Sequence, residues 1–238
     1  MEDSFALRVG GVVSADIAVP EHERELRFYA HVLTTGRTPL WRDDLMNSAG
    51  QPIIGLGERT AEYADLPLQW MPHIQVADVA ASAERALALG GTEILHGKDA
   101  EGVSLWAGLS DPSGVAFGVI PVVGAGEMPP AAHEGETGRI VSLDLALADA
   151  AGARSFYRDV IGWSPREVEE RIQGAGDGDA AREPVWVIHL PVADLEESLR
   201  RVEAEGGAIL ETLRAGEGAS ARALVQDPVG VRFGLRAG

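Results

Sequence analysis

The chain contains no cysteine, only one lysine (Lys98) and no long apolar run. The absence of cysteine excludes disulfides, thiolate nucleophiles, zinc ribbons and iron–sulfur clusters. No apolar run is long enough to span a bilayer, and the start, MEDSFALRVG, lacks the basic-then-apolar pattern of a signal peptide. We therefore expect a cytoplasmic protein that has no membrane partner.

Positive charge is also scarce. The 238 residues include 37 Asp and Glu against 20 Lys and Arg, which gives a formal net charge of −17. Such a charge repels phosphate backbones, so nucleic acid is not an expected partner. The apolar fraction of 45% is ordinary for a globular protein, and the length allows one or two domains with a core of their own.

What the chain does have is an internal repeat. Asp16, Phe28 and Tyr29 recur 128 residues later, and landmarks from Trp70 onward recur 116 residues later. The repeated pairs are Asp16 and Asp144, Phe28 and Phe156, Tyr29 and Tyr157, Trp70 and Trp186, His73 and His189, Asp111 and Asp227, and Gly118 and Gly234. We predict a first domain over residues 1–123, a linker over 124–137 and a second domain over 138–238.

The second copy is shorter by 12 residues, and the loss lies between Tyr157 and Trp186. We expect that the apolar strand PIIGLG of the first copy has no counterpart there and that a loop containing QGAGDGDAARE replaces it. The second binding cup should then be more open. This places the main site in the first domain or in a cleft that both domains share.

Each copy divides again into two similar halves. A short strand is followed by a helix that begins at an acidic residue and, in most cases, ends near a glycine. The acidic residues are Glu21, Asp78, Asp149 and Asp194. Two further apolar strands follow each second helix, and the last is entered through Asp-Pro-x-Gly, which favours a type I turn. The order predicts an α+β fold with helices on the outer face of curved, mostly antiparallel sheets.

Three features, each present in both copies, carry a family resemblance. They are the helix ends RFYAHVLTTG and SFYRDVIGW, the helix entries with a Gly-Gly exit, and the strands DPSGVAFGVI and DPVGVRFGLR. The chain resembles the vicinal oxygen chelate superfamily, also called the glyoxalase/bleomycin resistance/dioxygenase superfamily. The resemblance implies two tandem glyoxalase-like domains of paired βαβββ modules, each forming a cup. The family spans lyases, dioxygenases and metal-free antibiotic-binding proteins, so the fold alone does not fix the function.

The resemblance also implies where a metal would be held. The family's ligand positions correspond here to Ser14, Met71, Ser142, Val187, Gly118 and Gly234. Methionine, valine and glycine offer no hard donor to a divalent ion, and serine is a poor one. We therefore expect no metal and no cofactor, which argues against glyoxalase I and dioxygenase chemistry.

Because strands alternate faces with a period of two, the side chains two residues further along should point into the same cups. They are Asp16 and His73 in one cup and Asp144 and His189 in the other. These pairs could hold the modules in register, contact a ligand, transfer protons, or form part of a displaced metal site.

Trp70 and Trp186 fit a core position better than a ligand wall, whereas Trp106 adds aromatic surface to the first cup. Our leading hypothesis is a metal-independent protein that binds a small hydrophobic or aromatic molecule, such as an antibiotic or another secondary metabolite. The ligand-binding candidates are Asp16, His73, Trp70, Trp106, Asp144, His189 and Trp186. The alternative is a metal-free lyase, isomerase or tailoring enzyme that uses the Asp/His pairs. Either a monomer or a homodimer is compatible with the tandem arrangement.

Overall fold

The structure is a computed structural model that describes residues 7–33, 54–123, 140–176, 183–214 and 220–238. The residue contacts divide the chain into two compact units. Unit 1 contains residues 1–13, 71–128 and 144–186, and unit 2 contains 14–70, 129–143 and 187–238. Each unit therefore combines the second module of one repeat with the first module of the other.

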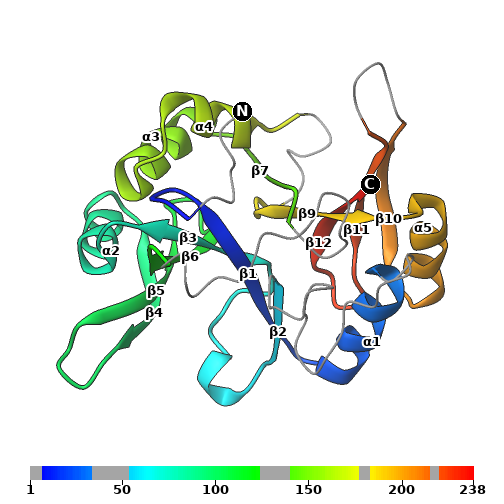
Figure 1. Ribbon diagram of the computed structural model, residues 1–238, viewed down its shortest axis with the longest axis horizontal. Coiled ribbons are helices and arrows are strands. Elements are labelled where there is room, and N and C mark those ends of the chain that lie inside the picture. Colours follow the sequence, from blue (N-terminus) through cyan, green and yellow to red (C-terminus); the bar gives the residue numbers. More distant parts are fainter. Residues whose placement is uncertain (1–6, 34–53, 124–139, 177–182, 215–219) are drawn as a thin grey trace. The chain divides into compact units, whose positions relative to one another are not determined.

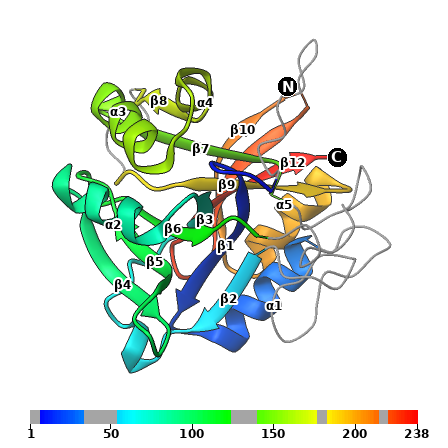
Figure 2. The ribbon, with the colours of Figure 1, turned by 60° about the vertical axis from the view of Figure 1, so that its left-hand side comes forward.

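Unit 1 contains three strands that pair antiparallel and a fourth strand that pairs with one of them in parallel. Its elements are β3 (Met71–Val76), α2 (Val79–Ala88), β4 (Thr92–Lys98), β5 (Ser104–Ser110), β6 (Ala116–Pro121), most of β7 (Ser142–Leu147), α3 (Ala150–Ile161), α4 (Pro165–Arg171) and β8 (Ile172–Gly174). In Figure 1, α2 lies beside β4 and β5, which it contacts. Figure 2 shows α3 and α4 close to β8.

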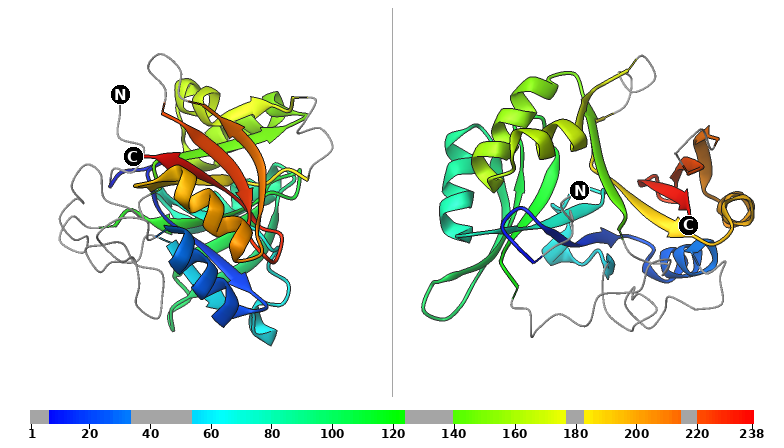
Figure 3. Two further views of the ribbon diagram at one scale, coloured as in Figure 1. Left: turned by 90° about the vertical axis from the view of Figure 1, so that its right-hand side faces the viewer. Right: turned by 45° about the horizontal axis from the view of Figure 1, so that its top comes forward.

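Unit 2 repeats this plan. Its elements are most of β1 (Val12–Val19), α1 (His22–Leu33), β2 (Ile54–Glu58), the short 3-10 helix η1 (Ala61–Tyr63), β9 (Val187–Val192), α5 (Leu195–Ala204), β10 (Ala208–Leu213), β11 (Arg222–Gln226) and β12 (Arg232–Ala237). The left view of Figure 3 shows α1 and α5 side by side along β10–β12. The Ser198 hydroxyl of α5 joins the two helices by donating to the Val32 carbonyl of α1 at 2.8 Å.

Two six-stranded sheets result, with strand orders β2-β1-β3-β6-β5-β4 and β10-β11-β12-β9-β7-β8. The register is mixed: β3 and β6 run parallel, whereas β4, β5 and β6 pair antiparallel. In unit 1, Gly10 N–H donates to the Gln75 carbonyl at 2.7 Å, which joins the start of β1 to β3. The predicted α+β class with paired βαβββ modules is confirmed. No helix in the described part of the chain is long and apolar enough to cross a membrane.

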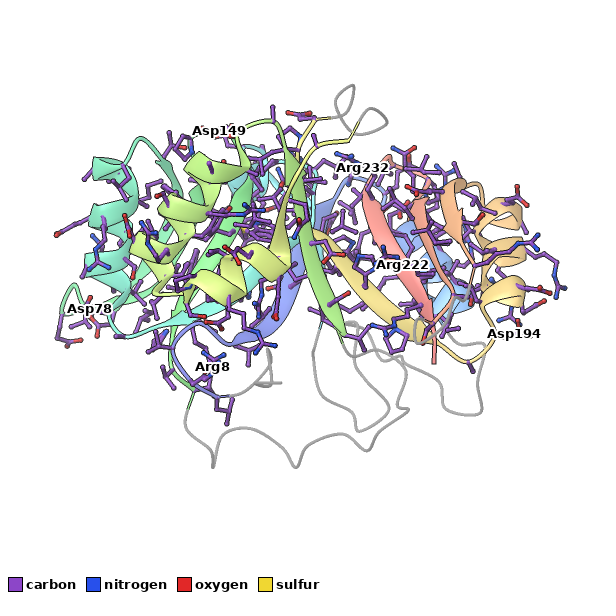
Figure 4. All side chains as sticks on the ribbon, turned by 90° about the horizontal axis from the view of Figure 1, so that it is seen from above. Arg8, Asp78, Asp149, Asp194, Arg222 and Arg232 are labelled. Carbon is purple, nitrogen blue, oxygen red and sulfur yellow. The ribbon has the colours of Figure 1, made fainter. Side chains whose placement is uncertain are left out.

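The helix boundaries follow from local chemistry. Asp78, Asp149 and Asp194 each accept a backbone N–H from the third residue on, at 2.9 Å, and so cap α2, α3 and α5 as expected. They are labelled in Figure 4. Gly162 ends α3 in the left-handed conformation with φ 87°, which a side chain disfavours.

The prediction for the shortened region is wrong. Strand β8 pairs in parallel with β7 in the way that β2 pairs with β1. Leu145, the repeat of Ile17, faces Ile172, which lies 116 residues after Leu56. The second copy therefore keeps this strand, and the missing residues precede it. Helix α4, with a Ser164–Glu167 capping box, leads directly into β8.

Candidate functional site

The repeated aromatic residues form one hydrogen-bonded triad in each unit. In unit 2, the Trp70 indole donates to the Tyr29 hydroxyl at 3.2 Å, and this hydroxyl donates to Asp227 Oδ2 at 2.9 Å. In unit 1, Trp186 donates to Tyr157 at 3.0 Å, and Tyr157 donates to Asp111 Oδ2 at 3.3 Å. Each triad thus takes its Asp from one repeat and its Tyr and Trp from the other.

These triads are core structures. Trp70, Trp186, Tyr29 and Tyr157 are all 0% exposed. Burial raises the pKa of both tyrosines well above the usual value of 10, because a phenolate would lose its solvation there. Both indole N–H groups are satisfied inside the protein, so Trp70 and Trp186 occupy the core positions that their pattern favoured. That either of them contacts a ligand stays a prediction.

The other carboxylate oxygen of each triad Asp organises a turn. Asp111 Oδ1 accepts the backbone N–H groups of Ser113 and Val115, at 2.8 and 3.0 Å. Asp227 Oδ1 accepts those of Val229 and Val231 in the same way. The Asp-Pro-x-Gly motif therefore has two roles, because it shapes the entry to the last strand and anchors a buried tyrosine. The spacing predicted only the turn.

Glu25 makes the triad of unit 2 different. It lies on the apolar face of α1, is 0% exposed, and neither carboxylate oxygen has a hydrogen-bond partner among the described residues. Burial, and then the charge of Asp227, raise the pKa of Glu25 from 4.5 to about 8. Glu25 is therefore a neutral acid near pH 7. Burial also raises the pKa of Asp227.

The matching position in unit 1 is Ala153, 128 residues after Glu25. A surface hollow of about 230 Å³ lies there, and Asp111, Ala153 and Phe156 are among its lining residues. The repeat thus conserves the triad geometry while only one copy places a second acid beside it.

Each predicted histidine lies against a glycine of the neighbouring strand. His73 faces Gly118 and His189 faces Gly234. A Cβ atom on Gly118 would stand 2.5 Å from His73 Cδ2, and one on Gly234 would stand 2.1 Å from His189 Nδ1. The glycines at the family's last-strand ligand positions therefore make room for the imidazole rings. His73 is half-buried and His189 is 7% exposed.

The two predicted aspartates have different surroundings. Asp16, on β1, lies over Gly55 of β2, where a Cβ atom would be 2.3 Å from Asp16 Oδ1. Asp144, on β7, raises the pKa of Arg171, opposing the larger lowering that burial causes. The Arg171 guanidinium lies 4.9 Å from the centre of the Trp163 ring. Asp16 and His73 belong to different units, as do Asp144 and His189, so the Asp/His pairings stay predictions.

Trp106 is the exposed aromatic of the predicted set. It projects from β5, is 42% exposed, and lies against Gly97 of β4, where a Cβ atom would be 2.2 Å from its Nε1. On the other face of β5, Ala107 and Leu109 are buried. Trp106 therefore stands on the face of the sheet that α2 leaves uncovered.

Gly108 forms an open floor two residues along from Trp106. Gly108 pairs with Gly118, and a Cβ atom added to Gly108 would meet nothing closer than 3.8 Å, the nearest groups being the Leu95 carbonyl and Met71 Sδ. Met71 and His73 come from β3 on the same face. The uncovered face of unit 1 thus has an indole, a thioether and an imidazole around a glycine floor. This floor is suited to a flat apolar molecule.

The family's metal does not fit these residues. Met71 and Gly118 stand at two ligand positions in unit 1, and Gly234 and Val187 stand at two in unit 2. None of these side chains is a hard donor. Among the described residues, no three His, Asp or Glu side chains gather into a possible metal site.

Comparison with known proteins agrees with the module arrangement. The family model of the glyoxalase-like domain matches residues 13–120. Residues 13–120 therefore carry the glyoxalase-like family pattern, and the chain as a whole resembles the vicinal oxygen chelate superfamily in fold. The Mn(II)-bound glyoxalase from Novosphingobium aromaticivorans is 15% identical with a TM-score of 0.57, covering 95% of this chain and 81% of that one. A catechol 2,3-dioxygenase is 14% identical with a TM-score of 0.57, covering 95% and 87%. At these identities the likeness shows the fold.

Two curated relatives of this chain come from Streptomyces. The anthracycline biosynthesis protein DauV of Streptomyces sp. (strain C5) is 31% identical over 133 residues, which are 56% of this chain and 44% of DauV. The anthracycline biosynthesis protein DnrV of Streptomyces peucetius is 26% identical over 185 residues, 71% of this chain and 66% of DnrV. The chain thus spans less than two thirds of the length of both relatives.

Proposed function

We propose that the chain binds a small, flat aromatic molecule on the uncovered face of unit 1 and does so without a metal. The observation that carries this proposal is the half-exposed Trp106 beside the open Gly108 floor. An exposed indole costs solvation free energy unless something covers it, and an aromatic ring stacks on it favourably. The relatives support an aromatic secondary metabolite as the ligand class, because both are named for anthracycline biosynthesis.

Metal independence is proposed from the donor set. A thioether and glycines occupy positions at which a hard divalent ion needs oxygen or nitrogen ligands. Without a metal the protein can hold, orient or sequester an aromatic compound through packing and a few polar contacts. His73, which borders the floor, supplies the polar contact in this arrangement.

Tryptophan fluorescence tests the binding. Trp70, Trp163 and Trp186 are at most 1% exposed, so among the described tryptophans Trp106 is the one that a surface ligand can contact. Because the Trp106 variants lack this reporter, their affinities are compared with that of the wild type through the change in the probe's own visible absorbance. Titration with 1,8-dihydroxyanthraquinone, a planar tricyclic probe, should quench the wild type. Trp106→Ala should weaken binding by about tenfold or more, and Trp106→Phe, which keeps a ring, should weaken it less. Equal binding by the wild type and Trp106→Ala would refute the proposed site.

A metal-free lyase or isomerase is the second candidate, because the His73 imidazole at the edge of the floor is a side-chain type that can act as a general acid or base. His73→Gln separates the two candidates. In a binding protein this variant should weaken binding modestly. In an enzyme it should abolish turnover of a bound aromatic substrate while binding and the thermal melt change little.

A further inference from the structure

The same face of the sheet in unit 2 has the opposite chemistry. Positions 116 residues after Trp106, Ala116 and Ile120 of unit 1 are occupied in unit 2 by arginines. These are Arg222 on β11 and Arg232 and Arg236 on β12. The apolar, aromatic surface of one unit is thus replaced by a basic surface in the other, within a chain whose net charge is −17.

Strand register places the three arginines on one face. Arg222 lies directly opposite Arg236, Leu224 opposite Gly234, and Gln226 opposite Arg232. The alternate residues between them, Phe233 among them, are buried, and the Phe233 ring packs against Phe28 and Tyr29 of α1. The arginine face is therefore the one that α1 and α5 leave uncovered (Figure 4 labels Arg222 and Arg232).

The centre of this face is His189. Its ring lies over Gly234, and Arg232 and Arg236 stand two residues to either side of that glycine. Residues two apart on a strand are about 7 Å apart, which is the span of a small organic acid. On strands β9–β12 the acidic side chain of this face is Glu211, on the edge strand β10 opposite Leu224.

Two of these arginines, Arg222 and Arg236, lack ion pairs among the described residues that would account for their positions. Most other described arginines make ion pairs or donate to backbone carbonyls, as Arg201 and Arg8 do. Arg222 and Arg236 have no ion pair with any described residue, although the chain contains 37 carboxylates. Like charges that face each other across a strand pair, with Cβ atoms about 5 Å apart, repel and destabilise a sheet. An anion that bridges them removes this repulsion.

We propose that the Arg222–Arg236 pair, with Arg232 and His189 beside it, binds the oxyanion of a small organic molecule, a carboxylate or a phosphate. Guanidinium groups recognise both through paired, charge-assisted hydrogen bonds. This site lies within unit 2 and does not depend on aromatic binding in unit 1. The uncovered sheet face therefore binds an aromatic ring in unit 1 and an acid group in unit 2.

The test is isothermal titration of the full chain with sodium acetate and, separately, with sodium phosphate, against sodium chloride at matched ionic strength. The double variant Arg222→Gln/Arg236→Gln should bind the preferred probe at least about tenfold more weakly, because each arginine supplies a charge-assisted hydrogen bond. Arg200→Gln is the matched control. It removes an exposed arginine of α5, in the same unit, that pairs with Glu197.

The thermal melt gives an independent readout. Without anion, Arg222→Gln should raise the melting temperature because it relieves the repulsion, and the bound probe should raise it in the wild type. Preference for acetate identifies a carboxylate ligand, and preference for phosphate identifies a phosphorylated one. Equal affinity of wild type and double variant, or no binding of either probe to the wild type, overturns the proposal. Trp106→Ala should bind both probes normally, so failure of the aromatic site is seen separately.

Discussion

Replacing Glu25 by glutamine removes a carboxyl group that is fully buried on the apolar face of α1, in the field of Asp227. Because the pKa of Glu25 rises from 4.5 to about 8 on folding, the folded chain holds a proton that the unfolded chain releases. The stability that Glu25 contributes should therefore be fully present below about pH 4.5 and be lost as the pH rises to about 8.

The magnitude follows from the same interval. Each pH unit between the two pKa values costs about 1.4 kcal/mol, so the loss between pH 4.5 and pH 8 is on the order of 3–5 kcal/mol. Glutamine has nearly the same shape as a protonated glutamate and cannot ionise. We expect Glu25→Gln to differ little from the wild type at pH 5 and to be more stable by a few kcal/mol at pH 8.

Urea unfolding followed by tryptophan fluorescence, at half-unit steps from pH 5 to pH 8.5, measures this difference. Glu23→Gln is the control, because Glu23 is an exposed acid in the first turn of the same helix. It should keep the pH dependence of the wild type. Parallel pH profiles for the wild type and Glu25→Gln would refute the reasoning, as would a loss of stability at pH 8.

Four further outcomes are expected. Tyr29→Phe and Tyr157→Phe should each lower the free energy of unfolding by about 1–3 kcal/mol, because a buried indole N–H and a carboxylate lose their partner; thermal melts of the full chain measure this. Gly118→Ala should displace the His73 ring and shift its imidazole NMR signals, whereas Gly108→Ala, whose Cβ has room, should not. Elemental analysis should find less than stoichiometric divalent metal; about one Zn, Fe, Mn or Ni per domain would contradict this. Chains cut within residues 124–137 should be poorly folded separately and fold on mixing, as seen by circular dichroism, because each unit combines modules from both halves.

The sequence predicted the features that depend on local chemistry. The helix caps at Asp78, Asp149 and Asp194 and the repeated modules follow from residue types at fixed spacing, and the structure confirms them. Strand β8 was missed because three residues, Ile172–Gly174, carry no periodic pattern of their own. Its pairing with β7 comes from tertiary packing.

The partners of the repeated residues could not be predicted. Tyr29 is 198 residues from Asp227, and nothing in an apolar helix face specifies which strand will cover it. Two features of the sequence could have indicated unusual polar groups. Glu25 shares a helix face with Phe28, Tyr29 and Val32 at helical spacing, and Arg232 and Arg236 alternate along one strand face. Glu25 is a polar group where packing favours an apolar one, and the two arginines form a basic strand face.

The most direct measurement of the proposed aromatic site is equilibrium binding of 1,8-dihydroxyanthraquinone to Gly108→Leu, in metal-free buffer. Leucine stands at the equivalent position of unit 2, residue 224, and a side chain at Gly108 has space in which to stand, so the variant should fold and fill the floor. We expect the wild type to bind the probe and Gly108→Leu to bind it at least about tenfold more weakly, with an unchanged circular dichroism spectrum. Undiminished binding by Gly108→Leu would contradict the account.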